Sequence, residues 1–235
     1  LLKPEGQQLI ATTKPIESLF DLQSDPMEFN DLANDPNMKE VLTQLRSVHD
    51  QWMKKVLDVG LIPEAIMRNW EDKNDQSIYK WIRTQEDFYD DLLLMSSTAN
   101  ENILFEGLNH DNEAVRYWAG QGLYNLDEKI GINTADRLKQ KLDDSVINIS
   151  ISAARALLKH EFSSKKLEEI LSLGLEAENE WTRLQTALVL DDFQSVLRGL
   201  ENQAQNQINT DPNKYVVRVL NHGLNLLNGT SNKVR

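Results

Sequence analysis

The longest amphipathic stretch in the first quarter of the chain follows Pro36. Asp35 is suited to cap a helix and Pro36 to open one, because aspartate accepts backbone N–H bonds and proline fixes a helical φ. Apolar residues then recur every three or four positions, which places them on one face of a helix. They are Met38, Val41, Leu42, Leu45, Val48, Trp52, Met53 and Val56. The pattern predicts a long helix with one apolar face, ended by Gly60.

Two other patterns lie before residue 100. Gln8–Thr12 and Ser18–Leu22 are interpreted as short strands around a Lys14-Pro15 turn, so they predict a β-hairpin. A second amphipathic helical stretch runs from Ile78 to Met95. Five of the six prolines lie in the first 63 residues, which predicts a mixed segment followed by a helical one.

Four segments beyond residue 100 resemble one another. They are Val115–Leu123, Ile149–Leu157, Thr182–Leu190 and Val217–Leu224. Their aligned positions are Arg116, Ser150, Arg183 and Arg218, at steps of 34, 33 and 35 residues. A period of that size, with apolar and small residues at helical spacing, indicates stacked helix pairs.

A short polar turn precedes each of these segments. The turns are Asn109–Asn112, Leu142–Ser145, Glu176–Asn179 and Asn209–Pro212, and their Asp and Asn side chains are expected to cap the following helix. The pattern resembles HEAT-like repeats, in which a turn carboxylate and an arginine commonly bond across neighbours. Because Ser150 stands at the arginine position of its segment, we expect that ladder to be interrupted there.

Composition limits the classes of partner and of chemistry that this chain can have. The 235 residues carry a net charge of −12, which disfavours nucleic acid and anionic lipid. The absence of cysteine excludes thiolate nucleophiles and zinc fingers, and no apolar run is long enough to span a membrane. Because the sequence opens on Leu1 without an initiator methionine, we expect it to start inside a longer protein or to be processed.

The residue types that usually carry catalysis do not converge in the sequence. His49, His110, His160 and His222 stand at no metal-ligand spacing. Paired acids at 90–91, 143–144 and 191–192 point about 100° apart on a helix, so solvated faces and caps explain them better. Gly120-Gln121-Gly122 indicates close helix packing rather than a dinucleotide loop. Five tryptophans, at 52, 70, 81, 118 and 181, could stack on sugar, although core positions are commoner.

One stretch of the sequence resembles a known protein family more specifically than the rest. The residues 14–36, KPIESLFDLQSDPMEFNDLANDP, resemble the C-terminal end of a bacterial formylglycine-dependent sulfatase, and Gly60-Leu61-Ile62-Pro63-Glu64 is also similar to bacterial members. The resemblance covers about residues 8–64. It implies a strand of a small sheet, a turn and a helix packed on the catalytic domain. Some bacterial members carry helical repeats after this piece, which suits residues 100–228.

The same resemblance shows what this chain lacks. The family's nucleophile comes from a Cys/Ser-x-Pro-x-Arg motif, and here Ser24 and Pro26 are followed by Glu28 where arginine is needed. Sulfate-ester hydrolysis needs the aldehyde hydrate and a cation. We therefore assign no catalytic, cofactor-binding or metal residue to this chain. Calcium and formylglycine are implied only for a full-length protein of that family.

The sequence thus predicts a mainly α protein: an N-terminal β-hairpin and helix, then a HEAT-like superhelical array. We expect a sulfatase-like segment at 1–64, linking helices at 65–99 and about four helix pairs at 100–235. The expected role is non-catalytic, in packing, cleft shaping or contact with a sulfatase catalytic domain of the same polypeptide. Resemblance alone places it in the periplasm or outside the cell.

Two other interpretations remain open. One is a stand-alone repeat scaffold that binds a protein partner, and the other is an enzyme of its own without a known motif. A Cys/Ser-x-Pro-x-Arg motif in the reading frame upstream of Leu1 would favour the sulfatase interpretation, whereas a start codon beside Leu1 would favour the scaffold.

Overall fold

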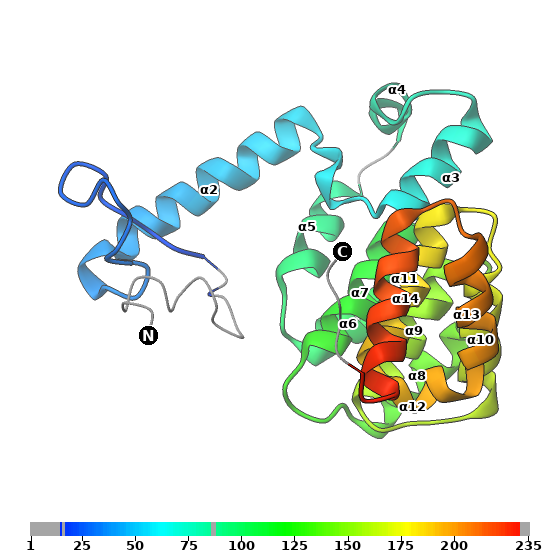
Figure 1. Cartoon of the computed structure of the whole chain (residues 1–235). Helices are drawn as coiled ribbons and strands as arrows, with labels where there is room; N and C mark the ends of the chain where they lie inside the picture. Colours follow the sequence, from blue (N-terminus) through cyan, green and yellow to red (C-terminus); the bar gives the residue numbers. More distant parts are fainter. Residues whose placement is uncertain (1–14, 16, 86–87, 231–235) are drawn as a thin grey trace. The chain divides into compact units, whose positions relative to one another are not determined.

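The computed structural model in Figure 1 describes residue 15 and residues 17–85 and 88–230. These residues are mainly helical, as predicted, and include no strand. The chain forms two compact units, Leu1–Val56 and Leu57–Arg235. The segment boundaries at 64 and 99 that the sequence suggests stay predictions.

The described residues of the first unit form a loop and one long helix. Asp35 accepts a hydrogen bond from the Asn37 backbone N–H at 2.8 Å, so the predicted cap is confirmed. It opens the 3₁₀ turn η2 (Pro36–Met38), which continues into α2 (Lys39–Val56). The helix ends before Gly60, because Leu57 takes a positive φ of 52° that breaks the helical path.

The predicted β-hairpin is not found. Gln8–Thr12 lies outside the described residues, and Ser18–Leu22 is irregular chain rather than strand. The Leu19 N–H donates to the Asp31 carboxylate at 2.9 Å, and its carbonyl accepts from the Leu32 N–H at 2.7 Å. One side chain and one backbone group therefore satisfy Leu19, and the turn that starts at Asp21 stops any ladder from extending.

The second unit is built from helices joined by short turns. The α-helices are α3 (Glu64–Asn74), α4 (Ile78–Trp81), α5 (Tyr89–Ser97), α6 (Glu101–Gly107), α7 (Glu113–Asn125), α8 (Ile132–Lys141), α9 (Ile147–Lys159), α10 (Lys165–Leu175), α11 (Glu180–Asp192), α12 (Gln194–Leu197), α13 (Glu201–Thr210) and α14 (Lys214–Leu227). The 3₁₀ turns are η3 (Val59–Leu61), η4 (Ile82–Thr84) and η5 (Arg198–Leu200).

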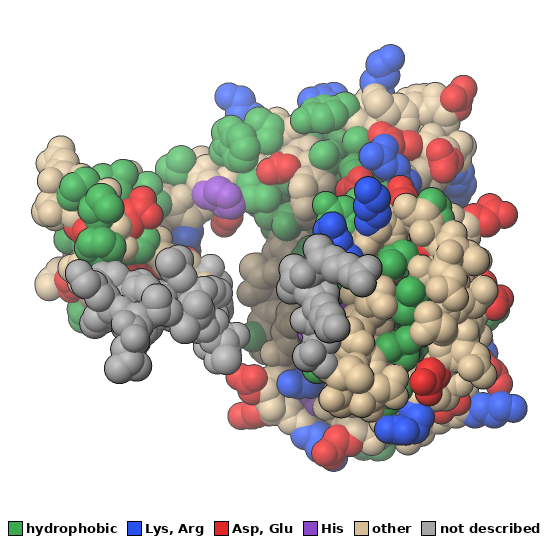
Figure 2. Space-filling model, in the orientation of Figure 1, with side chains coloured by type: hydrophobic (Ala, Val, Ile, Leu, Met, Phe, Trp, Pro, Cys, Tyr) green, Lys and Arg blue, Asp and Glu red, His purple; other side chains and the backbone are tan. Residues whose placement is uncertain are grey.

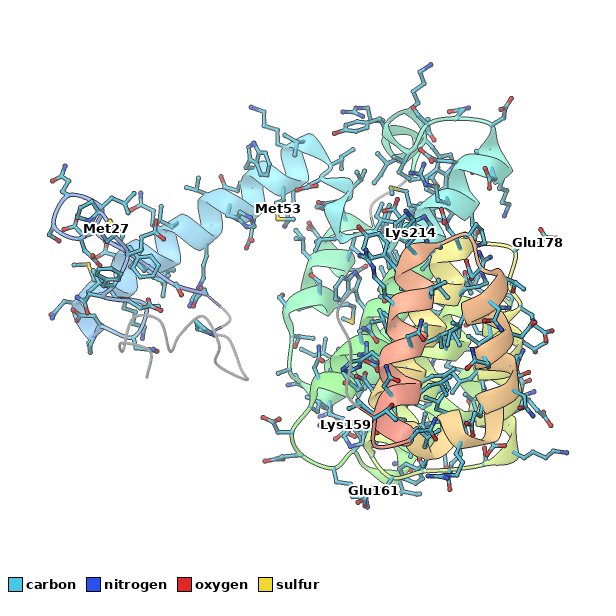
Figure 3. All side chains as sticks on the ribbon, viewed as in Figure 1. Met27, Met53, Lys159, Glu161, Glu178 and Lys214 are labelled. Carbon is cyan, nitrogen blue, oxygen red and sulfur yellow. The ribbon has the colours of Figure 1, made fainter. Side chains whose placement is uncertain are left out.

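These helices pack in two rows. The similar segments of the sequence become α7, α9, α11 and α14, each packed on the next, while α6, α8, α10 and α13 pack against them. In Figure 3, Glu178 and Lys214 lie at the end of the unit where α11 and α14 begin, and Lys159 and Glu161 lie at the opposite end. The helices of the first row therefore run in the same direction.

Small residues allow the close approach between rows and neighbours. Ala119, Ala153 and Ala187 are fully buried. A Cβ built on Gly120 of α7 would lie 2.5 Å from the Ser152 Oγ of α9, closer than real contacts allow. The close-packing interpretation of Gly120-Gln121-Gly122 is therefore confirmed. Within the described ranges, no helix has the length and apolar character that crossing a bilayer requires.

Candidate functional site

Two arginines hold the turns of the second unit in the same way. Arg116 donates to both oxygens of Asp144, at 3.0 and 3.1 Å, and to the carbonyls of His110 and Asp111 at 2.9 and 2.8 Å. Each guanidinium thus joins its own turn to the next one along the row.

Arg183 repeats the arrangement. It donates to Asp211 at 2.6 and 3.1 Å and to the carbonyls of Ala177 and Glu178, both at 2.8 Å. Both pairs are separated by 28 residues in sequence. The recurrence of one contact set in two turns is a structural device, since four hydrogen bonds of each arginine go to the protein itself.

The carboxylates of these pairs are almost completely buried from solvent. The side chains of Asp144 and Asp211 are 6 % and 0 % exposed. Burial opposes ionisation of Asp211, but hydrogen bonds from Arg183 and from the Asn213 N–H hold its pKa below the ordinary value. The same hydrogen bond raises the pKa of Arg183. Both groups of this pair are therefore charged at neutral pH.

The predicted interruption of the ladder is seen at Ser150. Its hydroxyl reaches only the Asp144 carbonyl, at 3.5 Å, and Glu178, 28 residues further on, is exposed. Arg218, the last equivalent, is exposed and stacks over the Tyr215 ring at 5.9 Å. Asn112 and Asn179 cap their helices as expected, whereas α9 has no side-chain cap and α14 is capped by Asn213.

A cavity of about 660 Å³ lies between α3, the end of α4 and the turn before α7. Trp70, Trp81 and Phe88 form its aromatic wall: the two indoles are 4.2 Å apart between ring centroids and tilted by 44°, and Phe88 meets Trp70 edge-on at 6.0 Å. Trp70 is 4 % exposed and donates its indole N–H to Glu113, while Trp81 is partly exposed.

The cavity is also lined by the polar segment His110–Glu113 and by Lys73 and Asn74. The His110 Nδ1 accepts from the Asn112 N–H at 3.0 Å, so its proton lies on Nε2, 3.2 Å from Asp91. The cavity is therefore half aromatic and half hydrogen-bonding.

A second candidate surface is the apolar stripe of α2, which consists of Val41, Leu45, Val48 and Trp52. These side chains are 44 %, 50 %, 56 % and 54 % exposed. Their spacing of four, three and four residues places them on one face of the helix. Figure 2 shows hydrophobic side chains on the surface along α2. The predicted apolar face exists, but in the described structure only Leu42 and Met53 of this helix are buried.

Comparison with known proteins gives one relationship. The chain is 37 % identical over 79 residues to an ulvan-active sulfatase of Formosa agariphila. The match covers 33 % of this chain and 13 % of that protein. No family model matches the chain, and no solved structure matches it. A sulfatase-like relationship is therefore supported for part of the chain.

The residues described in this chain do not fit a sulfatase catalytic centre. The Ser24 hydroxyl donates to the Asp21 carboxylate at 2.8 Å, and Glu28 stands where the family has arginine. The described residues contain no group of three or more His, Asp or Glu side chains placed to hold a metal ion. No step of sulfate hydrolysis is therefore derived for these residues.

The aspartates of the loop before α2 have local roles. Asp21, Asp25 and Asp31 accept backbone N–H groups of Gln23, Asn30 and Leu19 at 3.0, 2.7 and 2.9 Å. Backbone hydrogen bonds, first from Leu19 and then from Ala33, hold the pKa of Asp31 below its usual value. These acids therefore shape the loop before α2, which gives the motif a physical meaning in this chain.

The histidines lie apart. His49 is exposed beside Asp50, His160 is buried and bonds to the Leu123 carbonyl at 2.9 Å, and His222 lies 2.6 Å from Asp191. His160 therefore binds a neighbouring helix rather than only ending its own.

The paired acids do not face one another, as expected, but their solvated interpretation is wrong in part. Asp144 is buried against Arg116, and Asp192 pairs with Arg155 at 2.5 Å. The ladder expected from the resemblance includes Arg116–Asp144, whereas the Arg155–Asp192 pair, 37 residues apart, was not predicted. Sequence reasoning also missed the Trp81 cavity, whose walls are brought together only by the fold.

Proposed function

We propose that this chain is a non-catalytic part of a sulfatase-related protein, and that its first unit docks on a sulfatase catalytic domain. The stripe of Val41, Leu45, Val48 and Trp52 is the observation that carries this proposal. An amphipathic helix that leaves its apolar face in water is unusual in a stable unit, and such a face indicates a partner surface. The partial match to a sulfatase supports a sulfatase domain as that partner.

The size of the match supports the same partner. The matched segment is 13 % of the ulvan-active sulfatase, so that protein contains far more chain beside it. Burying a fully exposed valine or leucine side chain contributes about 1.5–3 kcal/mol. The four stripe residues are about half exposed, so each would contribute about half of that on docking.

We further propose that the second unit is a HEAT-like array and acts as a spacer or contact surface. The recurrence of the Arg116–Asp144 and Arg183–Asp211 contacts, with the same two carbonyl bonds each time, supports a repeated unit. By the resemblance of residues 14–36, the full-length protein would be a sulfatase, and its calcium and formylglycine would be held outside this chain. An exported or periplasmic location belongs to the same proposal.

The test measures association of two purified proteins. The ulvan-active sulfatase is produced without its matched segment and mixed with this chain in an analytical ultracentrifuge. We expect a one-to-one complex. Leu45→Glu with Val48→Glu should weaken it at least tenfold, because two charges would be buried.

The matched control is Thr43→Glu with Ser47→Glu. These residues are exposed on the opposite face of α2 and add the same charge, so binding should persist. The absence of a complex, or equal binding by both double variants, would contradict docking through the stripe.

The non-catalytic part of the proposal has its own measurement. The purified chain, incubated with an aryl sulfate and calcium, should release no sulfate. Turnover that survives removal of contaminating enzyme would overturn it.

A stand-alone scaffold is the second candidate. It is favoured by Arg218, which holds the ladder position on the last helix and forms no ion pair with another described residue. Under this alternative, partner binding would depend on Arg218 and not on the α2 stripe.

A further inference from the structure

We infer that the cavity between α3, the end of α4 and the turn before α7 is a binding site for a neutral sugar ring. The aromatic platform is Trp81. One side of its indole packs toward Trp70 at 4.2 Å, yet the residue lines the cavity and stays partly exposed. Planar aromatic surface at the wall of a polar cavity is suited to the apolar face of a pyranose, because both are flat and carry little charge.

Hydrogen-bonding groups line the same cavity as this platform. The Lys73 amine, the Asp111 carboxylate and the Asn112 side-chain amide nitrogen form no hydrogen bond with any other described residue. One carboxylate oxygen of Glu113 accepts a hydrogen bond from the Trp70 indole, and the second accepts none from the described residues. The cavity thus offers both donors and acceptors, and sugar hydroxyls need both.

The shape and charge select among ligand classes. A cavity of about 660 Å³ lies within the range of small-molecule sites. Among the described lining residues, two carboxylates and one lysine disfavour a sulfated or carboxylated sugar. A quaternary ammonium ligand needs an open cage of aromatic faces, but Trp70 already touches both Trp81 and Phe88. A neutral sugar is the class that remains.

This site is independent of the docking proposal. Its residues belong to the second unit, whereas the apolar stripe belongs to the first. Loss of sugar binding would leave complex formation unchanged, and the converse also holds.

The experiment is isothermal titration calorimetry of the full chain with cellohexaose, mannohexaose and xylohexaose, and with a sulfated carrageenan hexasaccharide. We expect at least one neutral hexasaccharide to bind and the sulfated one not to bind. Trp81→Ala should weaken binding at least about tenfold, since it removes the platform. Asp111→Ala should weaken it severalfold without touching the core, because Asp111 is exposed.

The matched control is Tyr79→Ala. Tyr79 is an aromatic residue of the same short helix, is 59 % exposed and does not line the cavity, so affinity should not change. Binding of no neutral hexasaccharide would overturn the inference. Wild-type affinity in both the Trp81→Ala and the Asp111→Ala variant would also overturn it, and so would a preference for the sulfated probe. If Trp81→Ala fails to fold, Asp111→Ala alone decides.

Discussion

The two units use the same kind of amphipathic helix to opposite effect. In the second unit, α7 and α9 bury nearly all their apolar side chains against neighbours, and residues such as Leu123 and Ile151 are 0 % exposed. In the first unit, α2 has an equally regular apolar face, but Leu45 and Trp52 are half exposed. The difference teaches that a helical pattern fixes which face seeks burial, while the supply of neighbours decides whether it is buried.

The largest expected effect concerns the dry ion pairs of the second unit. Arg183→Ala leaves Asp211 buried without its partner, which should lower the free energy of unfolding by about 3–5 kcal/mol. Arg218→Ala, at the equivalent but exposed position, should change it by less than about 0.5 kcal/mol. Urea unfolding followed by circular dichroism measures both, and similar losses in the two variants would contradict the comparison.

The same substitution in the two units gives the second effect. Leu123→Ala should cost about 2–5 kcal/mol, because Leu123 is fully buried and a cavity remains. Leu45→Ala should cost less than about 0.5 kcal/mol in the isolated chain. Thermal unfolding of the two variants tests the pair. A large loss for Leu45→Ala would mean that the stripe already has a partner within this chain.

The third effect probes close packing. Gly120→Ala places a methyl group 2.5 Å from the Ser152 Oγ, which should cost about 1–3 kcal/mol, reduced by up to about 1 kcal/mol of helix propensity. Gly199→Ala is the control, since the nearest atom to its Cβ would be 3.6 Å away. Calorimetric unfolding should show a lower midpoint for the first variant only.

The smallest effect is the part of stability that titrates. The pKa of Asp211 is lowered in the fold, so its contribution is present above the unfolded value of about 3.9 and is lost as pH falls through the folded one. The difference in unfolding free energy between the wild type and Asp211→Asn should therefore shrink below about pH 4. Unfolding curves at pH 7, 5 and 3 measure it, and a difference constant with pH would contradict the assignment.

Much of the helical unit could be predicted because its signals are local. The aligned Arg116, Ser150 and Arg183 indicate the spacing in sequence between the similar helices. The missing ladder contact at Ser150 followed from its side chain alone. Capping by Asn112 and Asn179 was equally local. The hairpin failed since a strand needs partners, and Leu19 instead found Asp31 and Leu32.

The candidate site was less accessible to sequence reasoning. Tryptophan positions suggested stacking or core without choosing between them. The two alternatives apply to two tryptophans that lie side by side. Trp70 is buried and bonded to Glu113, while Trp81, which packs against the Trp70 ring, is partly exposed in the cavity. No signal in the chain linked Trp81 to Asp111, because a cavity wall is made of residues from distant segments.

The sequence by itself determined the helices, their starts and the residues that must face a neighbour, because periodicity and capping act over a single turn of chain. Tertiary structure alone decided which faces were covered. It buried Asp144 and Asp211 beside arginines 28 residues away, left the α2 stripe in water and placed aromatic and polar walls around one cavity. Burial and charge pairing are properties of what comes to lie alongside a residue, and no local pattern contains them.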